Sequence, residues 1–316
     1  MKISVVIATC QRPLLLRRCL TALLMQDFED YEIIVVSDGT DPASRAVVKG
    51  FSSPLLKYAA LPAKKGPAAA RNIGWRQAAG TLIAFTDDDT IPDTHWLSRL
   101  WQHYHGELEA AFTGRLLVPL HGLPTDYELN TAQLEKADFI TANCACTKQA
   151  LERVGGFDER FTTAWREDSD LEFKLLQAGI PIYTVKTAVV AHPVRKAPWG
   201  VSLQEQRKSM YNALLFKKFP RLYRQKIQAR PAVHYYAIIG CCLLFLLSLP
   251  ARVGWLTALS LAAWCWLTLS FTVRRLKNTR KTPSHILEMT VTSLLIPFLS
   301  VYWTLYGAGK YRVLFF

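Results

Sequence analysis

The feature that most constrains the fold is a short apolar run that ends in three consecutive carboxylates. Residues 81–85 have the length and composition of a buried strand, and the acids of residues 87–89 follow almost directly. Open α/β sheets bind ligands at the carboxyl ends of such strands. Because adjacent acids repel one another, a divalent cation carrying a phosphorylated substrate would stabilise them. The alternative is a solvated turn in which these acids cap a helix opened by Pro92 and Asp93.

The first ninety residues repeat an order of apolar strand, polar loop and helix. Strands are predicted at residues 3–8, 32–36, 55–60 and 81–85, and a helix follows each of the first three. This order is typical of a mostly parallel sheet flanked by helices, so the expected fold class is α/β. The loops after the strands should face one crevice, which would collect Thr9, Arg12, Asp38, Lys64, Lys65, Asp87, Asp88 and Asp89.

The next hundred residues are less regular. Strands are predicted at 111–118 and 139–146, and helices at 148–154 and 167–178. The last of these helices opens with three acids, Glu167, Asp168 and Asp170. A helix dipole favours acids in the first turn, so this cluster has a purely structural explanation as well as a functional one.

Composition changes sharply near residue 220. Residues 1–220 mix charged and apolar side chains as a soluble domain does, whereas 221–316 consist of a basic segment and three apolar runs, at 232–249, 254–273 and 286–306. The first two runs lack charge and approach the ~20 residues of a spanning helix, which predicts a transmembrane hairpin. The third contains Glu288 and Pro297, which leaves spanning, re-entrant, interfacial and buried soluble helices open.

The net charge of +13 is concentrated beside these runs. Basic clusters beside apolar runs indicate an anionic membrane surface, and no nucleic-acid motif accompanies them. By the positive-inside rule, they place the large domain on the cytoplasmic side of an inner membrane crossed more than once. Seven cysteines without zinc-ligand spacing fit reduced thiols in the cytosol, and the start lacks an export signal of the usual kind.

Six motifs in order make the soluble region resemble a family 2 glycosyltransferase with the GT-A fold. They cover residues 2 to 195 and are VVIAT at 5–9 with Arg12, VVSDG at 35–39, GPAAARN at 66–72, FTDDD at 85–89, GGFDERF at 155–161 and EDSD at 167–170. Each motif alone is weak, and their order and gaps carry the resemblance. It implies a nucleotide-diphospho-sugar donor and a Mg²⁺ or Mn²⁺ cofactor.

The resemblance also implies roles for individual residues. Asp38 would accept a hydrogen bond from the ring N–H of uracil or thymine, above a loop containing Thr9 and Arg12. Arg71 would reach the diphosphate, Asp87 and Asp88 would approach the ribose and sugar, and Asp89 would ligate the metal. Asp168 corresponds to the general base of an inverting transfer, with Glu167 supporting it or touching the acceptor. His192 falls where relatives place a histidine near the metal, although a lone histidine after a strand is often structural.

Three functions follow as hypotheses. The first is transfer of a single sugar to a membrane-associated acceptor such as a lipid-linked glycan, because the polymerising relatives' Gln-x-x-Arg-Trp motif here has Lys208 in place of tryptophan. The second is transfer to polyprenyl phosphate, which would give a lipid-linked monosaccharide. The third is a nucleotide-binding membrane scaffold without catalysis, which the joint presence of metal and base motifs disfavours.

Overall fold

The computed structural model describes residues 1–315 and divides into two compact units. The first unit comprises Met1–Pro119 and Thr131–Val194, and the second comprises Leu120–Asn130 and the chain from Arg195 onward. The chain therefore leaves the first unit for eleven residues and returns to it. Each unit is described separately below.

Among the residues described, the first unit is built on one eight-stranded sheet with the order β3-β2-β1-β4-β7-β6-β8-β5. Its strands are β1 (Ile3–Thr9), β2 (Tyr31–Ser37), β3 (Leu56–Ala60), β4 (Leu82–Asp87), β5 (Ile91–Pro92), β6 (Ala111–Leu117), β7 (Cys144–Thr147) and β8 (Ile182–Ala191). Strands β3, β2, β1 and β4 are parallel to one another, whereas β7 runs antiparallel to β4 and β6. The predicted mixed, mostly parallel sheet is confirmed.

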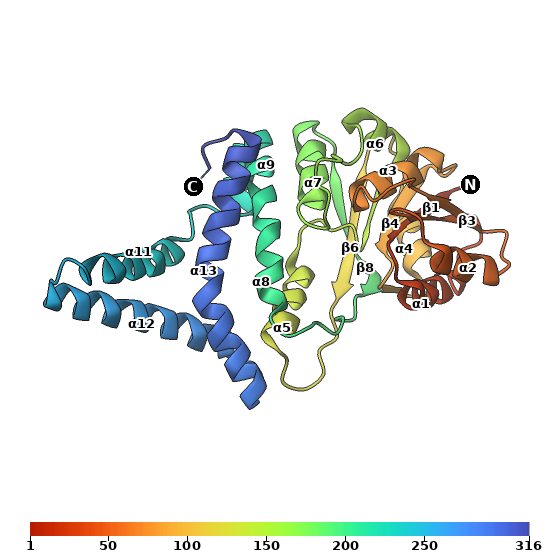
Figure 1. The fold of residues 1–316 in the computed structure, drawn as a ribbon. Helices are drawn as coiled ribbons and strands as arrows, with labels where there is room; N and C mark the ends of the chain where they lie inside the picture. Colours follow the sequence, from red (N-terminus) through yellow and green to blue (C-terminus); the bar gives the residue numbers. More distant parts are fainter. Residues whose placement is uncertain (316) are drawn as a thin grey trace. The chain divides into compact units, whose positions relative to one another are not determined.

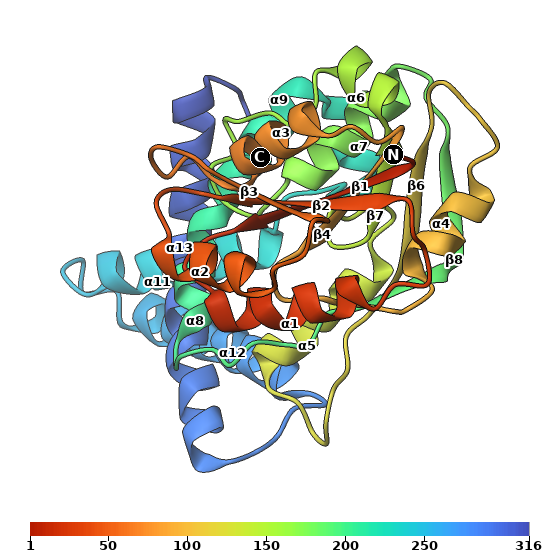
Figure 2. The same ribbon diagram turned by 90° about the vertical axis from the view of Figure 1, so that its right-hand side faces the viewer.

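Helices cover both faces of this sheet (Figure 2). Helices α3 (Pro67–Gln77), α6 (Lys148–Val154) and α7 (Glu167–Gln177) lie on one face, and α1 (Pro13–Leu24) and α2 (Pro42–Gly50) lie on the other. On the α3 face, strand residues at every second position, such as Val6, Ile34 and Phe85, are fully buried in one apolar cluster. Helix α3 approaches β1 closely, because a Cβ at Gly74 would lie 2.3 Å from Cγ1 of Val6.

Three local predictions differ from the structure. The strand expected at 139–146 is only β7, from Cys144 to Thr147, although Phe139 and Ile140 are buried as the apolar pattern suggested. No helix begins at Pro92: Ile91 and Pro92 form β5, and α4 (Trp96–His103) starts four residues later with no side-chain cap. The apolar pattern of the helix predicted at 167–178 also directs Leu171 and Leu176 at the core, but only Leu171 is buried and Leu176 is 38% exposed.

The second unit is helical (Figure 1). Its helices are α8 (Val201–Glu205), η2 (Gln206–Ser209), α9 (Met210–Lys218), α10 (Pro220–Lys226), α11 (Val233–Ser248), α12 (Gly254–Leu276) and α13 (Pro283–Tyr311), and α5 (Asp126–Ala132) begins within its inserted segment. A short 3₁₀ helix, η1 (Gln133–Lys136), follows α5. Packing of Ile238, Phe271 and Ile296 brings together α11, α12 and α13.

Two of the apolar helices are long enough to cross a membrane. They are α12, with 23 residues, and α13, with 29 residues, and only 22% and 28% of their most apolar windows are buried within the protein. Helix α11 has 16 residues, so at 1.5 Å per residue it falls short of the ~30 Å hydrocarbon core. The run predicted at 232–249 therefore forms a helix too short to span a membrane by itself. The run predicted at 286–306 belongs to α13, which is long and apolar enough to span one.

A buried arginine joins the inserted segment to the apolar helices inside the second unit. The Arg275 guanidinium donates to Oδ2 of Asp126 at 2.7 Å, to the Thr292 hydroxyl at 2.6 Å and to the Ser293 hydroxyl at 3.1 Å. The backbone N–H of Arg280 also donates to the Pro124 carbonyl at 2.8 Å. Because the Arg275 side chain is only 9% exposed, removing Asp126 would leave an uncompensated buried charge.

Candidate active site

The carboxyl ends of β1, β2 and β4 meet at one edge of the sheet. The parallel register pairs Thr9 with Ser37 and Ala8 with Asp87, so Asp38 and the triple Asp follow these strands side by side. Chain topology thus brings together residues separated by up to 80 positions. This edge contains most of the side chains that the sequence singled out.

Asp88 turns away from its two acidic neighbours. Its Oδ2 accepts a hydrogen bond from the Thr9 hydroxyl at 2.8 Å, and its Oδ1 accepts one from Nη1 of Arg12 at 2.9 Å. Burial raises the pKa of Asp88 to about 6, although the Arg12 charge opposes that rise. The three residues thereby fasten the loop after β1 to the loop after β4, and Asp88 is 2% exposed.

Asp38 holds the loop that precedes α3. Its Oδ1 accepts hydrogen bonds from the backbone N–H groups of Lys65, at 2.6 Å, and Gly66, at 2.9 Å. Gly66 has φ of +102°, and a Cβ there would lie 2.6 Å from the Thr162 carbonyl oxygen, so only glycine fits. A carboxylate accepts at four lone-pair sites, so Asp38 keeps acceptor capacity beyond these bonds.

Arg71 joins the acids after β4 to those of α7. Its Nη2 donates to Oδ1 of Asp87 at 2.7 Å, and its Nη1 donates to Oε1 of Glu167 at 3.0 Å. The guanidinium is buried and lies 5.7 Å from the Phe157 ring centroid. Its two ends face protein carboxylates, whereas the resemblance directs Arg71 to the donor diphosphate. The sequence did not indicate this bridge, because Arg71 and Glu167 are 96 positions apart.

The environment separates the proton affinities of these acids. Burial alone would raise the pKa of Asp87, but the charges of Arg71, His192 and Arg12, together with the Arg71 hydrogen bond, outweigh it and hold that pKa below its usual value. Burial, and then the neighbouring Asp168 charge, raise the pKa of Glu167 to about 7 against the pull of Arg71. Burial also raises the pKa of Asp168, opposed by the backbone N–H of Ser169, which donates to Oδ1 at 2.7 Å. Carboxylates with raised pKa values suit proton acceptance near neutral pH.

Capping does not account for these clusters. Helix α4 begins seven residues after Asp89, so the triple Asp caps nothing there. The N-cap of α7 is Arg166, which makes no side-chain capping bond, and Glu167 is instead bonded to Arg71. Asp168 is half-buried and bonds to the next residue's backbone. Glu167 is thus held by Arg71, and Asp170 is buried beside Lys174, so neither acid lies at a solvated helix end.

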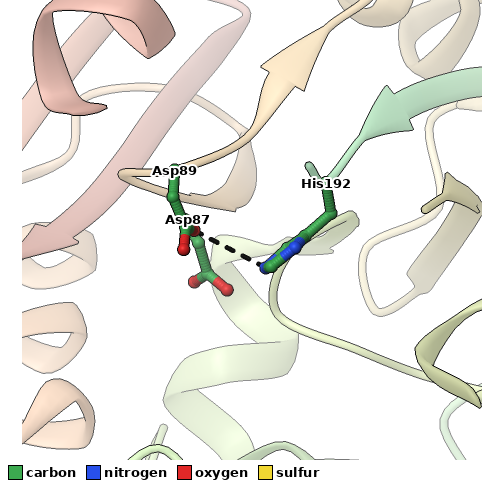
Figure 3. A group of neighbouring side chains, drawn as sticks. All are labelled: Asp87, Asp89 and His192. Atoms are coloured by element: carbon green, nitrogen blue, oxygen red, sulfur yellow. Dashed lines mark ion pairs between the residues drawn. The ribbon is translucent and has the colours of Figure 1, made fainter. Parts of the chain in front are cut away.

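Asp87, Asp89 and His192 form a group able to hold a metal ion (Figure 3). Each offers one ligand atom, and these atoms all lie within 4.8 Å of one another. Nε2 of His192 lies 3.5 Å from Oδ1 of Asp89, and its backbone N–H donates to the Leu117 carbonyl at 2.7 Å. Nδ1 of His192 is buried without a hydrogen-bond partner among residues 1–315, so Nε2 is the nitrogen that faces the two acids.

The sequence predicted Asp89 and His192 as metal ligands but assigned Asp87 to the substrate. No sequence signal indicated Asp87, because β4 ends at that residue and Asp88 and Asp89 lie in a turn, where strand alternation does not apply. Two carboxylates and one imidazole fit a divalent cation such as Mn²⁺ or Mg²⁺, which accept oxygen ligands.

The fold and motifs agree with comparisons to known proteins. Residues 4–159 match the model of Glycosyl transferase family 2, and residues 82–273 match Glycosyl transferase family group 2. A mannosyltransferase from Pyrobaculum calidifontis, solved in complex with GDP-Man and Mn²⁺, shares the fold with a TM-score of 0.57 and 17% identity. That match covers 98% of this chain and 87% of the other.

Curated relatives share more sequence. Glycosyltransferase AglE of Haloferax volcanii is 31% identical over 217 residues, which cover 65% of this chain and 70% of the relative. A GalNAc(5)-diNAcBac-PP-undecaprenol beta-1,3-glucosyltransferase of Campylobacter jejuni is 29% identical, covering 51% of this chain and 56% of the relative. A pre-mycofactocin glycosyltransferase of Mycobacterium tuberculosis is 30% identical, and the chain spans 40% of its length. Family models, fold and ordered motifs lead to one conclusion: the chain belongs to glycosyltransferase family 2.

Proposed function

We propose that this protein transfers a single sugar, with inversion at the anomeric carbon, from a UDP- or dTDP-sugar to a membrane-associated acceptor such as a lipid-linked glycan. The observation that supports this most is the continuous chain of groups from Asp89 and His192 through Asp87 and Arg71 to the acids of α7. One end suits a diphosphate with its cation, and the other suits proton removal from an acceptor.

The proposed reaction assigns one carboxylate to proton transfer. Asp168 takes the proton of an acceptor hydroxyl as that oxygen attacks the anomeric carbon, and the bond from that carbon to the nucleoside diphosphate breaks with its electron pair leaving on the phosphate. A bound divalent cation would supply positive charge to the departing diphosphate. Thr9, Arg12 and Asp38 shape the nucleotide side, where the resemblance places the base.

Arg71 acts on both sides of this reaction. By holding Asp87 it leaves that carboxylate ionised, as a metal ligand requires, and by holding Glu167 it orients the first turn of α7, where Asp168 lies. Lys208, which stands where polymerising relatives have tryptophan, is paired with Glu205. An ion-paired lysine offers no aromatic face to an acceptor sugar, which supports transfer of one sugar rather than polymerisation.

A membrane acceptor is supported by the apolar helices and by one relative, whose name specifies an undecaprenol diphosphate-linked substrate. A soluble acceptor gives no reason to place a catalytic domain beside lipid. Polyprenyl phosphate is the alternative acceptor. Its attacking oxygen is already anionic, so activity that survives loss of Asp168 would favour this alternative.

We place the protein in the inner membrane, with the α/β unit on the cytoplasmic side, because basic residues flank the apolar helices. After a carbonate or high-salt wash, the protein should remain with the membrane fraction, since hydrophobic insertion resists both treatments whereas charge attraction is screened by salt. Immunoblotting of pellet and supernatant measures this. If the protein is recovered in the supernatant, the helices bind the membrane surface only peripherally.

Incubation of membranes with a panel of labelled nucleotide sugars tests the proposed activity. One donor should transfer label to the lipid fraction, and mass spectrometry of the product should show one added sugar. Membranes containing an Asp168→Asn variant are the matched control. If no donor labels lipid, while labelled nucleotide still binds the purified protein, the nucleotide-binding scaffold becomes the better account.

A further inference from the structure

A cavity in the second unit lies apart from every residue used above. It has a volume of about 80 Å³ and is lined by α9, α10, the segment between α10 and α11, the start of α11 and the second half of α13. Its lining combines two arginines with aromatic and hydroxyl side chains, including Arg224, Arg230, Phe216, Tyr235 and Ser300. We infer that this cavity binds the phosphate group of an anionic membrane lipid.

The first support is the scarcity of acidic side chains among the described residues of this unit, 120–130 and 195–315. Within the described part of the second unit, 18 Lys and Arg side chains face four acids, and each acid is engaged elsewhere. Asp126 pairs with Arg275, Glu128 accepts from Thr125, Glu205 pairs with Lys208, and Glu288 accepts from the Gly200 N–H. These four acids thus leave Arg224 and Arg230 unpaired, and both arginines are exposed, so their charges are available to an anion.

The second support is the way one guanidinium is held. Cζ of Arg224 lies 5.1 Å from the Phe216 ring centroid, and Phe216 in turn packs against Tyr223 at 5.6 Å and Phe315 at 5.2 Å. Stacking on an aromatic cluster limits the rotamers of a flexible side chain, so less entropy is lost when its fork of N–H donors binds. A planar fork matches phosphate oxygens, and charge-assisted bonds of this kind are the stronger ones.

The third support identifies lipid as the source of the phosphate. Pro231 and Ala232 line the cavity, and the apolar helix α11 begins at the next residue, Val233, which is 65% exposed. If α11 enters a bilayer, the cavity lies at the depth of the lipid headgroups. Tyr235 and Tyr236 also line it, and tyrosine is enriched at that depth. A basic site at the membrane surface selects anionic lipids over zwitterionic ones.

Native mass spectrometry of the purified full chain in a non-ionic detergent tests this site without donor, acceptor or turnover, so its result is independent of the proposed transfer. Dioctanoyl phosphatidic acid should bind at least about tenfold more tightly than dioctanoyl phosphatidylcholine. The Arg224→Gln/Arg230→Gln double variant should lose about tenfold of that preference, since one charged hydrogen bond is worth about a tenfold change in affinity.

The Arg221→Gln/Lys226→Gln double variant removes the same charge from the same region, at positions outside the cavity lining. This control variant should keep the preference for phosphatidic acid over phosphatidylcholine. If both double variants lose that preference equally, the lipid is attracted by the overall positive charge and not by the cavity, and the proposal is wrong. If the Arg224→Gln/Arg230→Gln variant fails to fold, the Arg224→Lys/Arg230→Lys variant replaces it. Lysine keeps the charge but lacks the planar N–H donors of arginine, so the preference for phosphatidic acid should fall about threefold, and an unchanged preference would overturn the proposal.

Inorganic phosphate should compete poorly with the lipid. If it displaces phosphatidic acid at equal concentration, the cavity is a site for free phosphate instead.

Discussion

An Asp168→Asn variant should lose about 10²-fold or more in transfer rate while it folds normally and binds donor normally. Asparagine has nearly the same shape as aspartate but cannot take a proton, and general-base catalysis contributes about that factor. If Asp168 served only the end of α7, the variant would instead lose about 1 kcal/mol or less of stability and keep its turnover. Melting temperature, donor affinity and rate, measured on one preparation, separate the two outcomes.

The pH dependence gives a second measurement on the same residue. Burial raises the pKa of Asp168, and the base is active only when ionised, so the rate should rise with pH through a limb that lies above the usual aspartate range. Asp93→Asn is a matched control, because Asp93 is an exposed acid whose carboxylate accepts a hydrogen bond from the nearby backbone N–H of His95. Full activity in Asp168→Asn would remove this residue from the mechanism and leave Glu167 or Asp170 to be tested.

An Asp89→Ala variant should bind nucleoside diphosphate at least about tenfold more weakly in the presence of Mn²⁺ or Mg²⁺. Asp89 is one of three side chains whose ligand atoms lie within 4.8 Å, and even an indirect disturbance of a metal site costs 10- to 100-fold in affinity. Arg71 cannot replace the lost positive charge, since both ends of its guanidinium already face Asp87 and Glu167. Calorimetric titration of UDP and dTDP, with and without chelator, measures the effect.

The chelator response is the decisive part of that experiment. Wild-type protein and an Asp93→Ala control should both lose affinity when the metal is removed, whereas Asp89→Ala should hardly respond. Unchanged affinity together with an unchanged response to chelator would show that Asp89 is not a ligand.

Local patterns predicted the parallel half of the sheet well, because each strand there is a continuous apolar run with punctuating polar loops. The boundaries of β1, β2 and β4 lie within two residues of those expected. The antiparallel part of the sheet, around β7, was predicted less accurately. Residues 139–143 are buried yet form no strand, and burial alone produces the same apolar composition in a loop as in a strand.

Side-chain direction was the part of the site that sequence could not supply. Three adjacent acids look equivalent in a string, but Asp88 faces Thr9 and Arg12 while Asp87 and Asp89 face His192. The Arg71 bridge depends on the packing of α3 near α7, which is a tertiary contact without a local signature. The raised pKa of Glu167 follows from its burial and from the charge of its neighbour Asp168, and the burial is not visible before the chain is folded.

The ion pair between Arg275 and Asp126 has a consequence for how the chain is made. Its partners lie 149 positions apart, so the segment from Leu120 to Asn130 is synthesised long before the arginine that neutralises it. During translation the sheet of the first unit can form before the second unit is complete. The segment from Leu120 to Asn130, however, cannot form its ion pair until Arg275 of α12 has left the ribosome. A shortened chain that ends at residue 220 would carry Asp126 without its cation, and its solubility would not measure the stability of the native domain.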